Sequence, residues 1–181
     1  MEKTNEKIFT AEDAEKYTGD YIVIPNGYTA IGEEAFYERD NIISVEIPDS
    51  VTTIGYGAFS YCENLSEIIL TDSIENIESM AFSECKSLTS VTIPEKVTEI
   101  SDRVFSGCDK LVEVILHDGI TKIGYAAFSR CVGLENIEIP ESVEEIGYMA
   151  FNACIKLSEI NLPEGIDIIK RENILRMRLP Y

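Results

Sequence analysis

Five cysteines have a spacing that first suggests chemistry in this sequence. Each lies 23 residues after the previous one, at Cys62, Cys85, Cys108, Cys131 and Cys154. Stacked copies about 4.8 Å apart fall within the distance range of a disulfide, but their Cβ atoms would point the same way. A zinc site needs converging ligands, and a column does not converge. Because their number is odd and their neighbours are Phe and Ala, we expect reduced, buried thiols. An adventitious disulfide and a metal or catalytic role are the alternatives.

His117 is the only histidine, so any histidine-based catalysis would have to use it. We expect an exposed side chain without a role, with a binding contact and catalysis as alternatives. The sequence contains no G-x-S-x-G or H-E-x-x-H motif and no glycine-rich phosphate loop. We therefore predict no catalytic residue, no cofactor and no metal site.

A third pattern is one carboxylate at the same position of every 23 residues. We expect solvated turn residues here, because Asp and Glu are compatible with the bend after a strand. A row of cation sites and an acidic strip for a basic partner are the alternatives, although one carboxylate per level supplies few oxygens for calcium. The column consists of Asp49, Asp72, Glu95, Asp118, Glu141 and Glu164.

These columns belong to a repeat of the whole chain, which predicts a stacked architecture. Six of the seven phenylalanines fall in one column, at Phe36, Phe59, Phe82, Phe105, Phe128 and Phe151. We interpret residues 24–161 as six repeats of 23 residues. Gly32, Gly55, Gly124 and Gly147 share another column, where we expect a turn with positive φ.

The ends of the chain differ from the repeats. Residues 1–23 are interpreted as an N-terminal cap, in which a capping box at Thr10–Asp13 begins a short helix that runs to about Tyr17 and stops before Gly19. A disordered leader is the alternative. Residues 162–181 are interpreted as a degenerate seventh repeat that acts as a C-terminal cap, with Ile166, Ile169, Ile174 and Met177 in repeat columns.

Each unit matches the L-x-x-L-x-L pattern of a leucine-rich repeat, as in Leu65–Leu70. Alternation places Ile68 inward and Glu67 and Ile69 outward on a parallel sheet. Residues 58–62 suggest about one helical turn. The predicted fold is therefore an α/β repeat, a short leucine-rich repeat solenoid with a parallel sheet on one face and short strands, turns and helical turns on the others.

Composition limits the partners. The 181 residues carry a net charge of −18, which disfavours nucleic acid and anionic membranes as partners. No apolar stretch approaches the roughly 20 residues of a spanning helix, so we expect no membrane insertion. The first residues lack the apolar core of a secretion signal.

The outward residues of the sheet are the candidate binding surface, because solenoids present extended surfaces that vary between repeats. Exposed isoleucines beside glutamates resemble the mixture found at protein interfaces, and ordinary β-propensity is the alternative reading. The candidates are Glu46, Glu67, Ile69, Ser90, Thr92, Glu113, Ile115, Asn136, Glu138, Glu159 and Asn161. A column of Tyr56, Tyr125 and Tyr148 could bind sugars or cover the edge of the core.

The unit I-P-x-S-V-x-x-I-G-x-x-A-F-x-x-C-x-x-L-x-x-I, seen at Ile47–Ile68, resembles the BspA-type leucine-rich repeat family. The resemblance implies a surface or secreted protein of host-associated bacteria or protists that acts in adhesion. A cytoplasmic chain, or a fragment whose signal and anchor have been removed, is the alternative. Arg39 departs from the pattern by replacing Cys, and Glu78 and Ser101 by replacing the turn glycine.

From these patterns we expect a non-catalytic module that binds an unidentified protein, such as a host protein or a basic surface, through its sheet. A structural spacer within a larger surface protein and a carbohydrate-binding module are the alternatives. We expect a monomer, with end-to-end association through the open end of the stack as the alternative.

Overall fold

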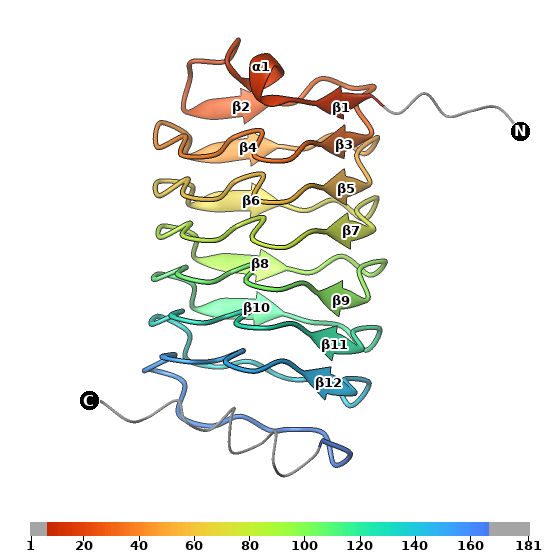
Figure 1. Cartoon of the computed structure of the whole chain (residues 1–181), viewed down its shortest axis with the longest axis vertical. Helices are drawn as coiled ribbons and strands as arrows, with labels where there is room; N and C mark the ends of the chain where they lie inside the picture. The colour runs from red at the N-terminus through yellow and green to blue at the C-terminus, as the bar shows by residue number, and fades with distance from the viewer. Residues whose placement is uncertain (1–6, 167–181) are drawn as a thin grey trace, which may run out of the picture.

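The protein is a solenoid whose successive coils stack along the long axis (Figure 1). The computed structural model describes residues 7–166. Its elements are β1 (Ile8–Phe9), α1 (Ala11–Ala14), β2 (Tyr21–Val23), β3 (Ala30–Ile31), β4 (Ser44–Glu46), β5 (Thr53–Ile54), β6 (Glu67–Ile69), β7 (Asn76–Ile77), β8 (Ser90–Thr92), β9 (Glu99–Ile100), β10 (Glu113–Ile115), β11 (Lys122–Ile123) and β12 (Glu145–Ile146). The predicted leucine-rich repeat solenoid with parallel strands is confirmed.

Two sides of each coil carry parallel strands. One side holds the sheets β2-β4-β6 and β8-β10, and the other holds β1-β3-β5-β7 and β9-β11-β12. Partners are one repeat apart, so Ser44 on β4 lies opposite Glu67 on β6. The central residue of each three-residue strand is buried and its neighbours point outward, as alternation requires.

Both sides are interrupted at the same level. β6 and β8 belong to different sheets, and so do β7 and β9. The first side also ends early, because residues 136–138 and 159–161 are extended but form no strand. The six-stranded sheet implied by the repeat is therefore replaced by two shorter sheets.

The third side consists of turns rather than the helical turn expected over residues 58–62. Ser60 N–H donates to Gly57 O at 2.9 Å, and Cys62 N–H donates to Phe59 O at 3.1 Å. Two residues per repeat adopt a left-handed conformation, which ends any helix after a single turn. They form two columns: Glu34, Gly57, Met80, Arg103, Ala126 and Met149, and Glu38, Tyr61, Glu84, Gly107, Arg130 and Ala153.

The glycine column serves a different purpose from the one predicted. Gly32, Gly55, Gly124 and Gly147 do not have the expected positive φ. A Cβ on Gly147 would lie 2.5 Å from the carbonyl carbon of Gly124, and one on Gly55 would lie 2.9 Å from Ile31 O. Close approach of consecutive coils, and not turn conformation, therefore favours glycine at these positions.

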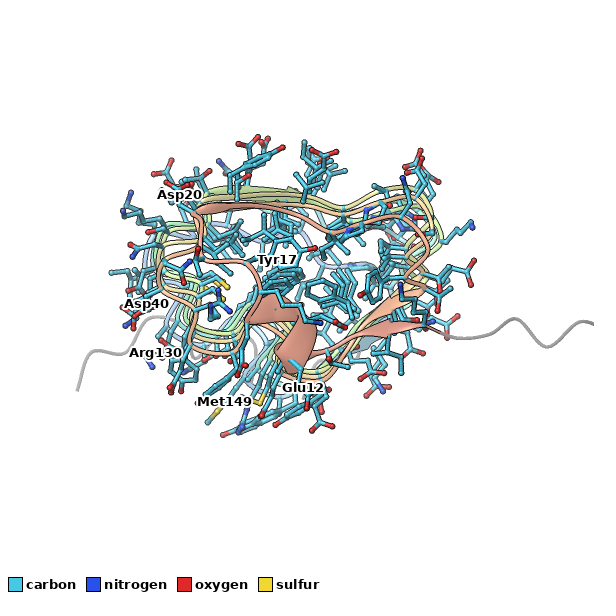
Figure 2. The ribbon with its side chains drawn as sticks, turned by 90° about the horizontal axis from the view of Figure 1, so that it is seen from above. Glu12, Tyr17, Asp20, Asp40, Arg130 and Met149 are labelled. Carbon is cyan, nitrogen blue, oxygen red and sulfur yellow. The ribbon has the colours of Figure 1, made fainter. Side chains whose placement is uncertain are left out.

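A ladder of seven phenylalanines forms the centre of the core: Phe9, Phe36, Phe59, Phe82, Phe105, Phe128 and Phe151. Neighbouring ring centroids lie 5.0 to 5.6 Å apart, and their planes are within 18° of parallel. Viewed along the solenoid axis, the coils superpose around an interior filled with side chains (Figure 2). Each ring is fully buried and contacts the same kind of ring on each side, so the core is uniform along the stack.

The N-terminal residues continue this architecture. The predicted capping box is present, since Asp13 N–H donates to Thr10 Oγ1 at 3.3 Å, but the helix ends at Ala14 instead of Tyr17. Arg39 occupies the cysteine column and donates to the carbonyls of Ala14 and Tyr17, which joins the helix to the first repeat. Of the C-terminal positions, Ile166 is buried, whereas Ile169, Ile174 and Met177 lie outside the described residues.

Candidate functional site

The outward residues of β2, β4, β6, β8 and β10, with positions 136, 138, 159 and 161, form the surface we call the sheet face. It is the upper edge of the coil in Figure 2, which begins near Asp20. All eleven sequence candidates are exposed on it. The strands β4 to β10 carry Glu46, Glu67, Ile69, Ser90, Thr92, Glu113 and Ile115. Asn136, Glu138, Glu159 and Asn161 lie on extended segments without strand pairing.

Sequence reasoning missed two residues of the sheet face. Tyr21 and Val23 on β2 point outward, with 56% and 46% of their surface exposed. They pair in register with Ser44 and Glu46. A shift of one repeat from those two positions would have found them, but the interpretation of residues 1–23 as a cap excluded them from the rows.

Exposed apolar side chains and carboxylates alternate on the sheet face. Ile69 is 68% exposed and Ile115 is 50% exposed, although both lie on strands. Among the described residues, the two outward rows contain no Lys or Arg. The carboxylates in these rows are Glu46, Glu67, Glu113, Glu138 and Glu159. The surface is therefore both apolar and acidic.

Three shallow hollows follow one another along this face. The first, of about 460 Å³, is lined by side chains that include Tyr21, Glu46, Glu67 and Ile69. The second, of about 500 Å³, lies between β6 and β8 where the sheets separate. The third, of about 530 Å³, lies between β10 and residues 136–138. Each is wide enough for side chains of a partner but too open to enclose a small substrate.

The five cysteines form no reactive site. All are free and buried, and each thiol contacts the carbonyl oxygen of a phenylalanine 26 residues earlier at 2.9 to 3.2 Å. Burial raises the pKa of Cys62 and Cys154 to about 12, and raises the pKa of the other three thiols as well. Because the thiolate is the nucleophile and metal ligand, the expectation of structural thiols is confirmed.

His117 is not the exposed bystander expected from the sequence. The side chain is half-buried, and its Nε2 lies 3.0 Å from Val97 O. Its Nδ1 accepts a hydrogen bond from Gly119 N–H at 3.0 Å. Both ring nitrogens are thus engaged with backbone, so His117 has a structural role in its turn.

The tyrosine column does not form a continuous strip. Tyr56 is separated from Tyr125 by Ser79 and Asp102, whereas the rings of Tyr125 and Tyr148 lie 6.3 Å apart. The guanidinium of Arg103 lies 5.1 Å from the centroid of the Tyr125 ring. Arg103 and Tyr148 come from the coils on either side of Tyr125. Both faces of that ring are therefore occupied, which leaves little flat surface for a sugar.

The acidic turn column consists of six exposed side chains. Within residues 7–166 no group of three or more His, Cys, Asp or Glu side chains is placed to hold a metal ion. Lys96 and Lys122, which the sequence placed near this column, form ion pairs with Glu75 and Glu145 instead. The column therefore has the geometry of solvated turn residues.

Comparison with known families gives one match. Residues 14–134 and 80–177 match the model of the BspA type leucine rich repeat region, with six copies. A comparison with curated proteins gives no match. In the part of the chain that the structure describes, no helix has the length and apolar character needed to cross a membrane.

Solved bacterial structures share the fold. A leucine rich cell surface protein from Faecalibacterium prausnitzii is 33% identical over 80% of this chain, with a TM-score of 0.66. Leucine-rich repeat proteins from Eubacterium ventriosum and Treponema (T. pallidum) are 29% and 31% identical over 82% of the chain, with TM-scores of 0.75 and 0.58. The chain spans only 48%, 40% and 61% of the lengths of these three proteins.

Proposed function

Because the chain belongs to the BspA-type leucine-rich repeat family, we propose that it is a non-catalytic module that binds a protein partner through the sheet face. Stacked repeats hold this surface in one shape before the partner arrives. A preformed surface lowers the conformational entropy lost on association, so more of the contact energy contributes to affinity. Recognition then depends on which side chains the repeats display.

One observation carries this proposal: isoleucines that are more than half exposed stand beside carboxylates on paired strands. Ile69 lies on β6 next to Glu67, and Ile115 lies on β10 next to Glu113. Full burial of one such side chain by a partner contributes about 1.5–3 kcal/mol. The acidic residues around it favour partners with a complementary charge and oppose acidic ones.

The proposal that the module is non-catalytic is supported by the state of its candidate groups. The thiols are buried with a raised pKa, and both nitrogens of His117 contact backbone. The three hollows are open, and none brings a base next to a nucleophile.

We place the module in adhesion or host recognition at the bacterial cell surface, as a monomer. The similar protein from Faecalibacterium prausnitzii is described as a cell surface protein, and the chain spans 48% of that protein. A net charge of −18 opposes self-association at low salt.

The proposal is tested by a pull-down from host and bacterial lysates with the parent chain and with the double variant Ile69→Lys/Ile115→Lys. The matched control is Ile8→Lys/Ile155→Lys, which changes two exposed isoleucines that lie outside the sheet face. Circular dichroism establishes that all three fold.

We expect a partner that the parent and the control retain and the sheet-face variant loses. Retention that weakens with added salt would report the contribution of the carboxylates. If the sheet-face variant retains the same proteins as the parent, or the parent retains none, the proposal is wrong and a structural spacer becomes the better account.

A further inference from the structure

The end of the sheet face nearest the N-terminus differs from the remainder in its chemistry. Tyr21 from β2, Glu46 from β4, and Glu67 and Ile69 from β6 line one hollow of about 460 Å³. Neighbouring strands pair in register here, Tyr21 with Ser44 and Glu46 with Ile69. Three consecutive coils therefore hold an aromatic ring, two carboxylates and an aliphatic side chain around one space.

The polar groups of this hollow are oriented toward one another. Tyr21 Oη donates a hydrogen bond to Glu46 Oε2 at 2.7 Å. This bond raises the pKa of Tyr21 most strongly, and the charges of Glu46 and Glu67 raise it further. Both carboxylates thus act on the same point beside the ring, and the phenol uses only one of the two oxygens of Glu46.

The carboxylates of this hollow are not neutralised within the chain. Six ion pairs occur among the described residues, and all of them lie outside the two rows of the sheet face. The paired acids are Asp13, Glu63, Glu75, Glu84, Glu135 and Glu145. The basic residues of the protein are thus used elsewhere, which leaves Glu46 and Glu67 available to a positive group from outside.

We infer that this hollow receives a basic side chain of the protein partner, arginine in preference to lysine, whose neighbouring apolar residue packs on Ile69; the inference rests on the proposed function. A guanidinium can stack on Tyr21 while its N–H groups donate to Glu46 and Glu67. Its aliphatic stem can lie along Val23 and Ile69, which are 46% and 68% exposed. The other two hollows are lined by no aromatic side chain.

The test is an NMR titration of the ¹⁵N-labelled parent chain with the peptide acetyl-Gly-Arg-Gly-Leu-amide. We expect the largest shift changes at the amides of Tyr21, Glu46, Glu67 and Ile69. The same peptide with citrulline, a neutral isostere of arginine, should bind at least about tenfold more weakly, because charge-assisted hydrogen bonds are lost. A lysine peptide should bind with an intermediate Kd.

Matched variants separate this hollow from general charge attraction. Glu46→Gln/Glu67→Gln should weaken the arginine peptide about tenfold, whereas Glu138→Gln/Glu159→Gln removes two carboxylates from the same face and should change the Kd less than about twofold. Equal weakening by both variants, equal binding of the citrulline peptide, or no binding to the parent overturns the inference. It is also overturned if calcium chloride alone shifts the same amides, because the hollow then binds any cation.

Failure of this inference is distinguishable from failure of the proposed function. A protein that Glu46→Gln/Glu67→Gln retains in the pull-down and Ile69→Lys/Ile115→Lys loses would leave recognition by the sheet face intact. The same result would reject the basic side chain as the group that fills the hollow.

Discussion

The phenylalanine ladder and the two strand-bearing sides differ in continuity. The ladder runs from Phe9 to Phe151 without a gap, whereas both sides lose strand pairing between the coil of β6 and β7 and the coil of β8 and β9. At that level the rings of Phe82 and Phe105 remain 5.6 Å apart. Side-chain packing therefore maintains the stack where the backbone hydrogen bonds of both sheets are interrupted.

The interruption coincides with a local change in sequence. Glu78 and Ser101, in consecutive repeats, replace the glycine that allows neighbouring coils to approach. In other repeats the glycine N–H reaches the preceding coil, as Gly124 does to Ile100 O at 2.7 Å. At the interruption the Ser101 hydroxyl donates to Ile77 O at 2.6 Å instead. A side-chain donor thus substitutes for a backbone donor, while the turn side still bonds through Phe82 N–H to Val104 O at 3.0 Å.

Ionising the thiols beside the ladder should have the largest effect. Their folded pKa lies above the model value of 9.0, at about 12 for Cys62 and Cys154. Stability is therefore fully present below about pH 9 and falls between about pH 9 and 12, by about 1.4 kcal/mol per thiol and pH unit. Urea titrations between neutral pH and about pH 10.5 measure this loss. The variant Cys62→Ala/Cys154→Ala should show a shallower decline, and an unchanged slope would contradict the assignment.

Truncating the ladder at the interruption should have the next largest effect. Phe82→Ala should lower the free energy of unfolding by about 3–5 kcal/mol. Because no strand pairing supports the stack there, we also expect unfolding in two steps. Phe59→Ala is the control, since it removes the same ring where strands on both sides are paired. Urea unfolding followed by circular dichroism compares them. Identical single transitions would show that the sheet interruption has no energetic consequence.

A smaller effect should follow from changing a side-chain donor on the strand-bearing part of the coil. His117→Ala leaves Val97 O without its partner and should cost about 1–3 kcal/mol. Two repeats earlier, Ser73 Oγ performs the same task by donating to Val51 O at 2.8 Å.

The double variant His117→Thr/Gly119→Ser copies Thr71 and Ser73 and should recover most of that stability. Gly119→Ser alone should destabilise the protein, because a Cβ there would lie 2.8 Å from His117 Cε1. Thermal unfolding of the three variants forms a double-mutant cycle. Additive effects would show that positions 117 and 119 are independent.

The smallest effect is expected for Ser101→Gly, which restores the repeat glycine at the interruption. The backbone N–H can then approach Ile77 O, but glycine loses more conformational entropy, so the net change should stay below about 1 kcal/mol. Hydrogen exchange is the more sensitive measurement, and the amide of residue 101 should exchange more slowly. Unchanged exchange would mean that Ser101 does not cause the interruption.

The sequence predicted the fold because its columns repeat with one period. The burial of the phenylalanines and cysteines and the outward direction of Glu67 and Ile69 follow from that period and from strand alternation. The rows of the sheet face were found for the same reason, except for Tyr21 and Val23, whose repeat lacks the usual motif.

Other features depend on distances between coils, which no single repeat reveals. The glycine column was assigned to a positive φ because turns usually explain such glycines, whereas contact with the preceding coil is the actual constraint. The role of His117 depends on the absence of a serine hydroxyl at position 119 and on a carbonyl 20 residues away. The helical turn over residues 58–62 was wrong because the left-handed residues on the turn side are mostly not glycine.

These left-handed residues have a consequence for how the protein can diversify. A side chain in that conformation costs about 1–2 kcal/mol relative to glycine, yet ten of the positions carry Glu, Tyr, Met, Arg or Ala. The neighbouring coils dictate the backbone there, so the residue type is left open. Mutations at these turns can therefore vary the surface opposite the sheets, repeat by repeat, without changing the path of the chain.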